Sequence, residues 1–242
     1  MQFETVPGFG LGRLIDDPAL VDAVDAADSL MKDHANLLLQ AHWSRLIPAS
    51  TPTAYDLDIL IRAVDAKWCT RFPEANGVHG QWSARPTAQI LLVCAVPDAT
   101  RLLACFIHEF GHYLDYMNRP RVDGFPLTLF LRDETAAEQL VLECLGPTEL
   151  THNRTCAPAT RAEIHRLLTA EADLNDNAAQ DASVDFLDCD QKQLDAYALA
   201  NELVQRRSST FADILHINDK TFQDMLLSSP GLWSPPPAGE HA

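Results

Sequence analysis

The chain has 242 residues, and 47% of them are hydrophobic, which is enough apolar surface for a buried core that needs no disulfide to hold it together. Its formal net charge of −16 argues against a nucleic acid or an anionic membrane as partner, because such partners are bound through clustered lysine and arginine. A peptide or protein partner, especially a basic one, fits this charge better, and the charge also fits a soluble acidic surface with no partner.

From the sequence we expect no segment that directs the chain to a membrane or out of the cell. Its first residues lack a basic start followed by an apolar stretch, and no segment approaches 18 unbroken apolar residues. The six cysteines form no Cys-x-x-Cys pair, and several stand in apolar runs, which predicts reduced and mostly buried thiols. We therefore expect a cytoplasmic protein.

The first half of the chain predicts helices followed by a short hairpin. A helix is expected from Asp17 to about Ile47, with proline at its first position. A second helix is expected over residues 57–68, where five apolar residues recur at helical spacing. Residues 88–96 are apolar, partly β-branched and bounded by prolines, which predicts a strand, and residues 78–83 are expected to pair with it.

The second half predicts helices only. Their expected bounds are 98–118, 132–145, 160–174, 191–207 and 220–227. Residues 229–242 are rich in proline and poor in apolar groups, which predicts a flexible tail. The pattern as a whole predicts one mainly helical α+β domain over residues 1–228, with a small sheet.

Residues 108–112 read His-Glu-Phe-Gly-His, an H-E-x-x-H motif inside a predicted helix. Positions i and i+4 of a helix project His108 and His112 side by side toward one ion. Glu109 lies about a quarter-turn away, where a general base can hold a water against a metal without ligating it. Gly111 costs roughly 1 kcal/mol in a helix interior relative to alanine, which predicts that another chain segment or a substrate backbone passes close to it.

A catalytic zinc ion usually has three protein ligands and an open fourth position, so a third ligand is needed. The metzincin spacing would place a histidine six residues after His112, where this chain has Asn118. The predicted helix 132–145 carries Glu134 and Glu138, four residues apart on one face, with an alanine pair that allows close approach to the motif helix. A carboxylate from this helix is therefore expected, and the residues alone leave both glutamates open.

With these residues the chain resembles, over residues 88–145, the gluzincin branch of the HExxH zinc metallopeptidases, the zincins. The resemblance implies a zincin-like domain with a small β-sheet next to the motif helix. It also implies that the strand 88–96 is an edge that binds extended peptide, although an ordinary core strand fits that segment as well.

The resemblance further implies the residues of the site. His108, His112 and Glu134 would hold Zn²⁺, Glu138 would orient a ligand histidine, and Glu109 would act as general base in peptide-bond hydrolysis. Exchanged roles for Glu134 and Glu138 stay open. The expected activity is that of a zinc metallopeptidase acting on a peptide or protein, while the cleavage preference and the oligomeric state have no signal in the sequence.

Other interpretations of the motif exist. The chain could be a zinc-stabilised binding or regulatory protein without turnover, or another metal-dependent hydrolase or oxygenase, since two histidines and a carboxylate also suit ferrous iron. Weaker metal candidates are Cys94 or Cys105 upstream of the motif, a calcium-like run from Asp173 that lacks the needed glycine, and the pair His152 and Cys156. Five residues are chemically able to donate a proton to a developing oxyanion, namely Tyr113, Tyr116, His165, Tyr197 and His216.

Overall fold

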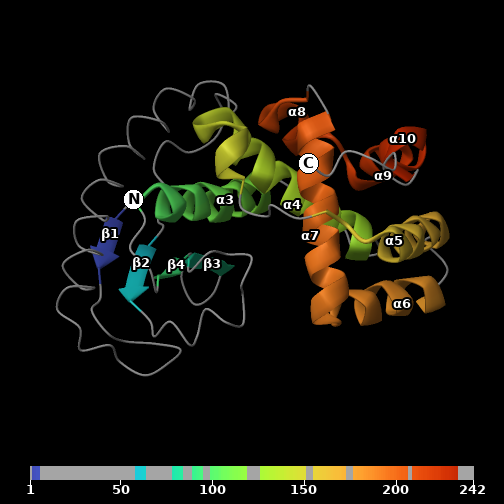
Figure 1. Ribbon diagram of the computed structural model, residues 1–242, viewed down its shortest axis with the longest axis horizontal. Coiled ribbons are helices and arrows are strands. Elements are labelled where there is room, and N and C mark those ends of the chain that lie inside the picture. Colours follow the sequence, from blue (N-terminus) through green and yellow to red (C-terminus); the bar gives the residue numbers. More distant parts are fainter. Residues whose placement is uncertain are drawn as a thin grey trace, which may run out of the picture.

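The computed structural model describes residues 2–5, 58–63, 78–83, 89–94, 99–118, 126–150, 155–172, 177–206 and 209–233. Within these ranges the protein is mainly helical, which confirms that part of the predicted fold class. The strands gather at one end of the molecule, most helices lie at the other, and α3 and α4 lie between them (Figure 1). The helix predicted from Asp17 to Ile47 falls outside the described residues.

Along the chain, the four described strands come first and the described helices follow. The strands are β1 (Gln2–Thr5), β2 (Asp58–Ala63), β3 (Val78–Ser83) and β4 (Gln89–Cys94). The helices are α3 (Ala99–Asn118), α4 (Pro126–Leu145), the 3-10 turn η2 (Pro147–Glu149), α5 (Pro158–Glu171), α6 (Asn177–Leu187), α7 (Asp190–Arg206), α8 (Phe211–His216), α9 (Asp219–Leu227) and α10 (Pro230–Trp233). No helix in these ranges combines the length and the apolar character needed to cross a membrane.

The four strands form one sheet in the order β1-β2-β4-β3. β1, β2 and β4 run parallel, while β3 pairs antiparallel with β4 and places Trp82 opposite Ile90. Ile90 and Leu92 of β4 are fully buried. The edge role expected for the strand at 88–96 is therefore wrong, because β4 lies between β2 and β3, and the two edge strands of the sheet are β1 and β3.

The helix predicted over residues 57–68 is also wrong where the structure describes it, since residues 58–63 form the strand β2. The segment reads Asp-Ile-Leu-Ile-Arg-Ala, with three consecutive apolar residues, two of them β-branched. A strand inside a parallel sheet is covered on both faces and carries such continuous runs, which coincide with helical spacing over a short window. β2 is paired on both sides, by β1 and by β4.

α4 runs through the centre of the molecule, where it packs against α3 and against all the helices from α5 to α9. It begins at Pro126, six residues before its predicted start, with proline at the first helical position. The buried carboxylate of Glu171 on α5 accepts hydrogen bonds from the backbone N–H groups of Leu127 and Thr128, at 2.9 and 3.1 Å. A side chain from a distant helix thus satisfies the free N–H groups that begin α4.

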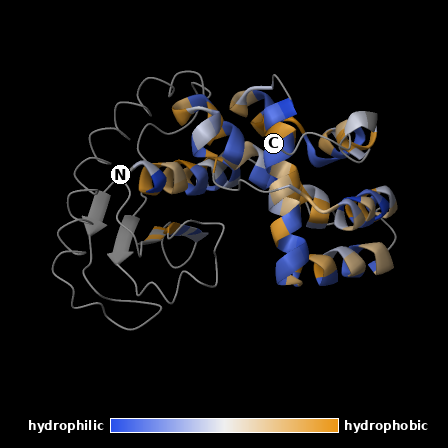
Figure 2. Cartoon of the chain, viewed as in Figure 1, coloured by the Kyte–Doolittle hydropathy of each residue, from blue (hydrophilic) through white to orange (hydrophobic). Residues whose placement is uncertain are grey.

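Two apolar clusters flank α4. One lies between the sheet, α3, α4 and α8, and the other lies among α4, α5, α6, α7, α9 and α10. The helices show apolar and polar sides accordingly (Figure 2). The two clusters fix α4 from opposite sides, so its polar residues are held in defined positions.

The flexible tail predicted over residues 229–242 includes residues that are in fact helical. Residues 230–233 form α10, in which Leu232 is buried and its carbonyl accepts a hydrogen bond from Arg161 Nη1 at 2.7 Å. The Trp233 indole N–H donates to the Leu226 carbonyl at 2.9 Å. Residues 234–242 lie outside the described ranges, and the single-domain prediction stays a prediction.

The four cysteines whose side chains the structure describes form no disulfide with one another, as expected, but they are less buried than predicted. Cys156 is buried, Cys105 and Cys144 are half-buried, and Cys189 is exposed.

Candidate metal centre

The motif lies where α3 crosses α4, and a glycine lets the two helices approach. A Cβ atom on Gly111 would lie 2.8 Å from the Ala137 Cα and 3.3 Å from the Ala137 Cβ, which is closer than ordinary contact. The sequence left open whether another chain segment or a substrate backbone passes close to Gly111, and the neighbour is a chain segment, α4. The small residues on both helices bring the side chains beside them within reach of one another.

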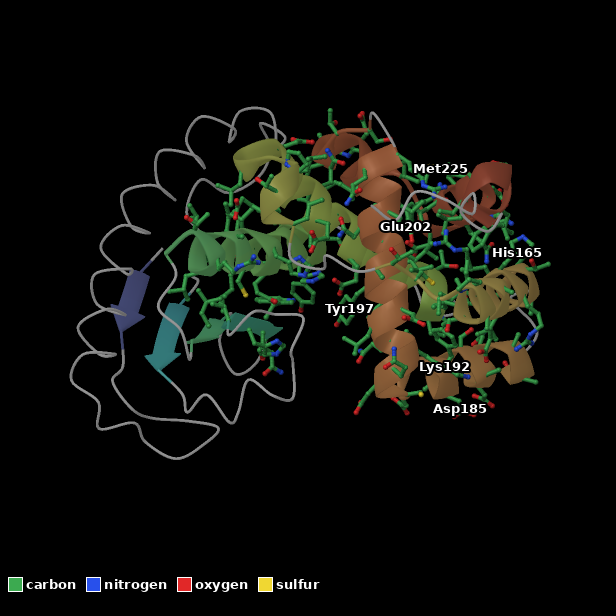
Figure 3. All side chains as sticks on the ribbon, in the orientation of Figure 1. His165, Asp185, Lys192, Tyr197, Glu202 and Met225 are labelled. Atoms are coloured by element: carbon green, nitrogen blue, oxygen red, sulfur yellow. The ribbon has the colours of Figure 1, made fainter. Side chains whose placement is uncertain are left out.

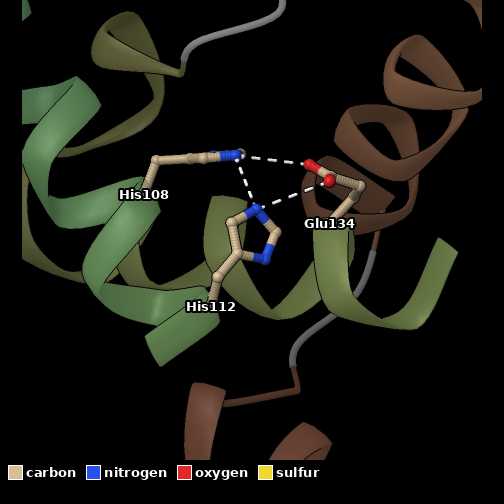
Figure 4. Close-up of side chains that lie close together, drawn as sticks. All are labelled: His108, His112 and Glu134. Carbon is tan, nitrogen blue, oxygen red and sulfur yellow. Dashed lines mark hydrogen bonds and ion pairs between the residues drawn. The ribbon is translucent and has the colours of Figure 1, made fainter. Parts of the chain in front are cut away.

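His108 and His112 of α3 and Glu134 of α4 converge on one point (Figure 4). The two Nε2 atoms lie 3.1 Å apart, and the rings are nearly perpendicular at 83°. Glu134 directs one carboxylate oxygen to each histidine, with Oε2 at 3.3 Å from His108 Nε2 and Oε1 at 3.4 Å from His112 Nε2. His108 and Glu134 are buried, while His112 is slightly more exposed.

These distances match those between neighbouring ligands of a tetrahedral metal. Ligand atoms that each lie about 2.0–2.1 Å from zinc are separated from one another by about 3.3–3.4 Å. The three residues therefore fit a metal ion without rearrangement of the backbone, and together they could hold one. Two histidines and one carboxylate leave a coordination position open for water or substrate.

Glu138 touches the far side of the same histidine. Its Oε1 lies 2.9 Å from His108 Nδ1, and its side chain is completely buried. A histidine whose Nδ1–H donates to a carboxylate presents its Nε2 lone pair on the opposite side of the ring. Glu134 thus faces the centre, and Glu138 orients His108 from behind, which is the arrangement that the resemblance implies.

The charges favour a cation between these residues. Burial alone would lower the pKa of His108, but Glu134 and Glu138 outweigh burial and hold that pKa well above its usual value. Burial would raise the pKa of Glu134, yet the rings of His112 and His108 pull it far below its usual range. These shifts show that the site stabilises a positive charge between the three residues. A divalent metal ion carries a larger positive charge than a proton, so the same electrostatics favour a metal ion there.

Glu109 lies beside this group without belonging to it. It is buried, and burial raises the pKa of its carboxyl group, while the nearby His112 and His108 act in the opposite direction. Its carboxylate accepts a hydrogen bond from the backbone N–H of Trp82 on the edge strand β3. A carboxyl group with a raised pKa next to a metal site is a candidate for proton transfer.

Gly80 of β3 is a residue of the site that sequence reasoning missed. A Cβ atom there would lie 2.6 Å from Glu109 Cγ, 2.8 Å from Glu109 Oε1 and 2.7 Å from Cys105 Sγ. The absent side chain therefore leaves the space that Glu109 fills. A glycine within a predicted strand was the available signal, because such glycines mark close approach of other groups.

One of the five candidate proton donors is electrically coupled to the site. Tyr197 of α7, labelled in Figure 3, has a pKa raised first by burial and then by the negative charges of Glu134 and Glu109. Its ring packs edge-on against Phe130 at 5.0 Å between centroids, and Phe130 stands one helical turn before Glu134. Burial and the charges of these two carboxylates therefore favour the protonated form of the Tyr197 hydroxyl.

The other four candidates make aromatic contacts or are exposed. Tyr113 and Tyr116 pack with Trp82, at 5.2 and 5.5 Å between ring centroids. The ring of His165 on α5 contacts Trp233, and His216 is exposed on α8.

The weaker metal candidates gain little support. Within the described ranges, the group suited to a metal is that of His108, His112 and Glu134. The run that starts at Asp173 and the residue His152 lie largely outside these ranges, and nothing is described of the Cys94 side chain.

No protein-family model, no curated protein and no solved structure matches this chain.

Proposed function

We propose that the protein is a zinc-dependent hydrolase of peptide bonds with a zincin-like fold. The observation that carries the proposal is the triangle of His108 Nε2, His112 Nε2 and the Glu134 carboxylate, with the separate carboxylate Glu109 beside it. Two imidazoles, one carboxylate and an open position are typical of catalytic zinc sites. When bound, zinc would lower the pKa of its water and polarise the substrate carbonyl group.

In this proposal Glu109 is the general base and then the general acid. Its carboxylate takes a proton from the attacking water as the water oxygen bonds to the carbonyl carbon, and it delivers that proton to the amide nitrogen as the C–N bond breaks. The raised pKa of Glu109 suits both roles, because proton transfer in each direction is efficient when the pKa lies closer to the working pH.

Tyr197 is the proposed hydrogen-bond donor to the carbonyl oxygen. Its hydroxyl keeps its proton because burial and the charges of Glu134 and Glu109 oppose ionisation. A donor aimed at an oxygen that becomes negative in the transition state lowers the barrier. Tyr197→Phe is expected to lower turnover and to leave zinc bound.

The edge strand β3 is the proposed binding element for an extended peptide. Its position at the end of the sheet order leaves one side without a partner strand among the described elements, and Gly80 and Trp82 place it over the motif helix. A peptide in extended form can add to such an edge through its main chain.

The test compares zinc-loaded wild-type protein with Glu109→Gln, using casein labelled with a self-quenched dye as an unfolded-protein probe. Hydrolysis is expected to stop when a chelator removes zinc, to return when zinc is restored, and to fall by about 10²-fold or more in Glu109→Gln without loss of zinc. Asp185→Asn, an exposed acid-to-amide change on α6, serves as matched control and keeps full activity. A Glu109→Gln protein with both zinc and full activity would contradict the mechanism.

The same samples separate the alternative functions. A wild-type protein that binds zinc and never cleaves the probe would favour a binding or regulatory role. Elemental analysis that finds iron in place of zinc would favour an oxygenase or another metal-dependent enzyme.

A further inference from the structure

We propose that the edge strand β3 positions the general base, because its backbone at Gly80 and Trp82 forms a slot that holds the Glu109 carboxylate beside the metal centre. The inference rests on the proposed function and adds two positioning residues to it. Neither residue is a metal ligand, and neither belongs to the H-E-x-x-H motif.

The first wall of the slot is the bare backbone of Gly80. The Glu109 side chain fills the space in which a Gly80 side chain would begin, with Glu109 Cγ only 2.6 Å and Oε1 only 2.8 Å from an added Cβ. Cys105, one turn before Glu109 on α3, closes the same space with its Sγ at 2.7 Å from that Cβ. Any side chain at position 80 must therefore displace Glu109.

The second contact is the hydrogen bond from the Trp82 backbone N–H to the Glu109 carboxylate. The Trp82 ring fixes this stretch of β3 against α3, since it packs on Tyr113 and Tyr116 with centroid distances of 5.2 and 5.5 Å. Tyr113 is almost completely buried, so its own position is fixed by packing and the Trp82 ring rests against a rigid neighbour. The strand is thus held to α3 on one side of Glu109 by an aromatic contact, while the carboxylate is held by the backbone.

The physical consequence is a restricted orientation of the base. A glutamate has three rotatable side-chain bonds, and a carboxylate that sampled them freely would spend little time in line with the attacking water. A steric slot and one N–H donor reduce this freedom before substrate binds. A misplacement of about 1 Å at a catalytic group can cost about 10²-fold in rate, so the slot should act on turnover.

The first experiment compares Gly80→Ala with Gly231→Ala, because an added Cβ at Gly231 has no neighbour within 4 Å. Gly80→Ala is expected to keep its zinc affinity, measured by chelator competition, within about threefold of wild type, and to lower kcat on quenched casein by about 10-fold to 100-fold. The KM should change much less than kcat. Gly231→Ala should match wild type in all three quantities.

A second readout does not depend on turnover. The visible absorption of the Co²⁺-loaded protein responds to the metal ligands and to the hydrogen bonds around them. Gly80→Ala and Glu109→Gln should both alter this spectrum, while Gly231→Ala should leave it unchanged. This readout separates the two hypotheses, because an inactive wild-type protein would refute the peptidase proposal and still report whether the slot holds Glu109 at the metal.

A second pair of variants covers the case in which Gly80→Ala does not fold. Trp82→Ala removes the ring and keeps the backbone N–H, whereas Trp82→Pro removes both, and proline is tolerated on edge strands. Trp82→Pro should show the larger change in kcat and in the Co²⁺ spectrum. The inference is overturned if Gly80→Ala retains wild-type kcat and spectrum, or if the two Trp82 variants behave alike.

Discussion

Gly111→Ala adds one methyl group at the contact between α3 and α4. The new Cβ would lie 2.8 Å from the Ala137 Cα, which is 0.6 Å short of the 3.4 Å at which ordinary contact begins. The obstacle is a backbone atom, so it cannot rotate away, and the two helices must separate locally by about 0.6 Å. The Glu134 carboxylate lies within one turn of Ala137 and moves with α4.

This displacement is large compared with what a metal site tolerates. Functional metal–ligand distances stay within about 0.2 Å of their ideal values, so a shift near 0.6 Å withdraws Glu134 from the ion. We expect the zinc affinity of Gly111→Ala to fall by about 10-fold to 100-fold or more. The metal-free fold should suffer less, because an overpacking cost of about 1–3 kcal/mol is offset by about 1 kcal/mol of better helix propensity.

The assay is competition for zinc with a chromophoric chelator, combined with thermal unfolding of the metal-free protein. Gly231→Ala is the matched control, since it makes the same change in a helix where the added Cβ meets nothing within 4 Å. A zinc affinity for Gly111→Ala within threefold of wild type would refute the view that the close approach of α3 and α4 builds the site.

Three further predictions concern residues around the site and the fold. Glu138→Ala removes the carboxylate 2.9 Å from His108 Nδ1 and should weaken zinc binding by about 10-fold to 100-fold in the same chelator assay, without changing the ligands themselves. Arg132→Met should lower the free energy of unfolding in urea by about 3–5 kcal/mol, because this fully buried guanidinium pairs with two buried aspartates, on α3 and α9. Thr210→Ala should lower the free energy of unfolding by about 1 kcal/mol, because it removes the capping box of α8. Hydrogen bonds from Thr210 lower the pKa of Asp213, so the contribution of this cap is present at neutral pH and is lost as the pH falls through the acidic range, which urea unfolding at several pH values would measure.

The centre of the site was accessible from the sequence because its geometry is local. The motif helix was predicted over 98–118 and spans Ala99–Asn118, so the spacing of His108 and His112 could be converted into a common direction. The second helix could be related to the first because Glu134 and Glu138 stand at helical spacing and the adjacent Ala136 and Ala137 allow close approach to α3. What remained open was which glutamate faces the centre, and the structure places Glu134 there.

Tertiary contacts explain most of what was missed. The start of α4 depends on Glu171, a residue more than forty positions away, and no local pattern reveals that partner. β2 resembles a helix in its short apolar pattern, and only its pairing with β1 and β4 settles its conformation. The order of the strands, in which β4 is internal and β3 is at an edge, likewise depends on the pairing of β4 with the distant strand β2.

The role of Gly80 shows the same limit at the scale of one residue. In the sequence Gly80 is one glycine within a predicted strand. Its importance for the site comes from the side chains of α3 that lie opposite it, which the sequence does not reveal. Tyr197 was one of five candidates, and its distinction comes from the charges around it, which depend on how α7 packs against α4.

The most direct test is anomalous diffraction at the zinc edge from crystals of the zinc-loaded protein. One peak is expected about 2.0–2.2 Å from His108 Nε2, His112 Nε2 and a Glu134 oxygen, with the Glu109 carboxylate beside the ion and outside its ligand shell. A peak located elsewhere, or Glu109 bound directly to the metal in place of Glu134, would contradict the proposed site.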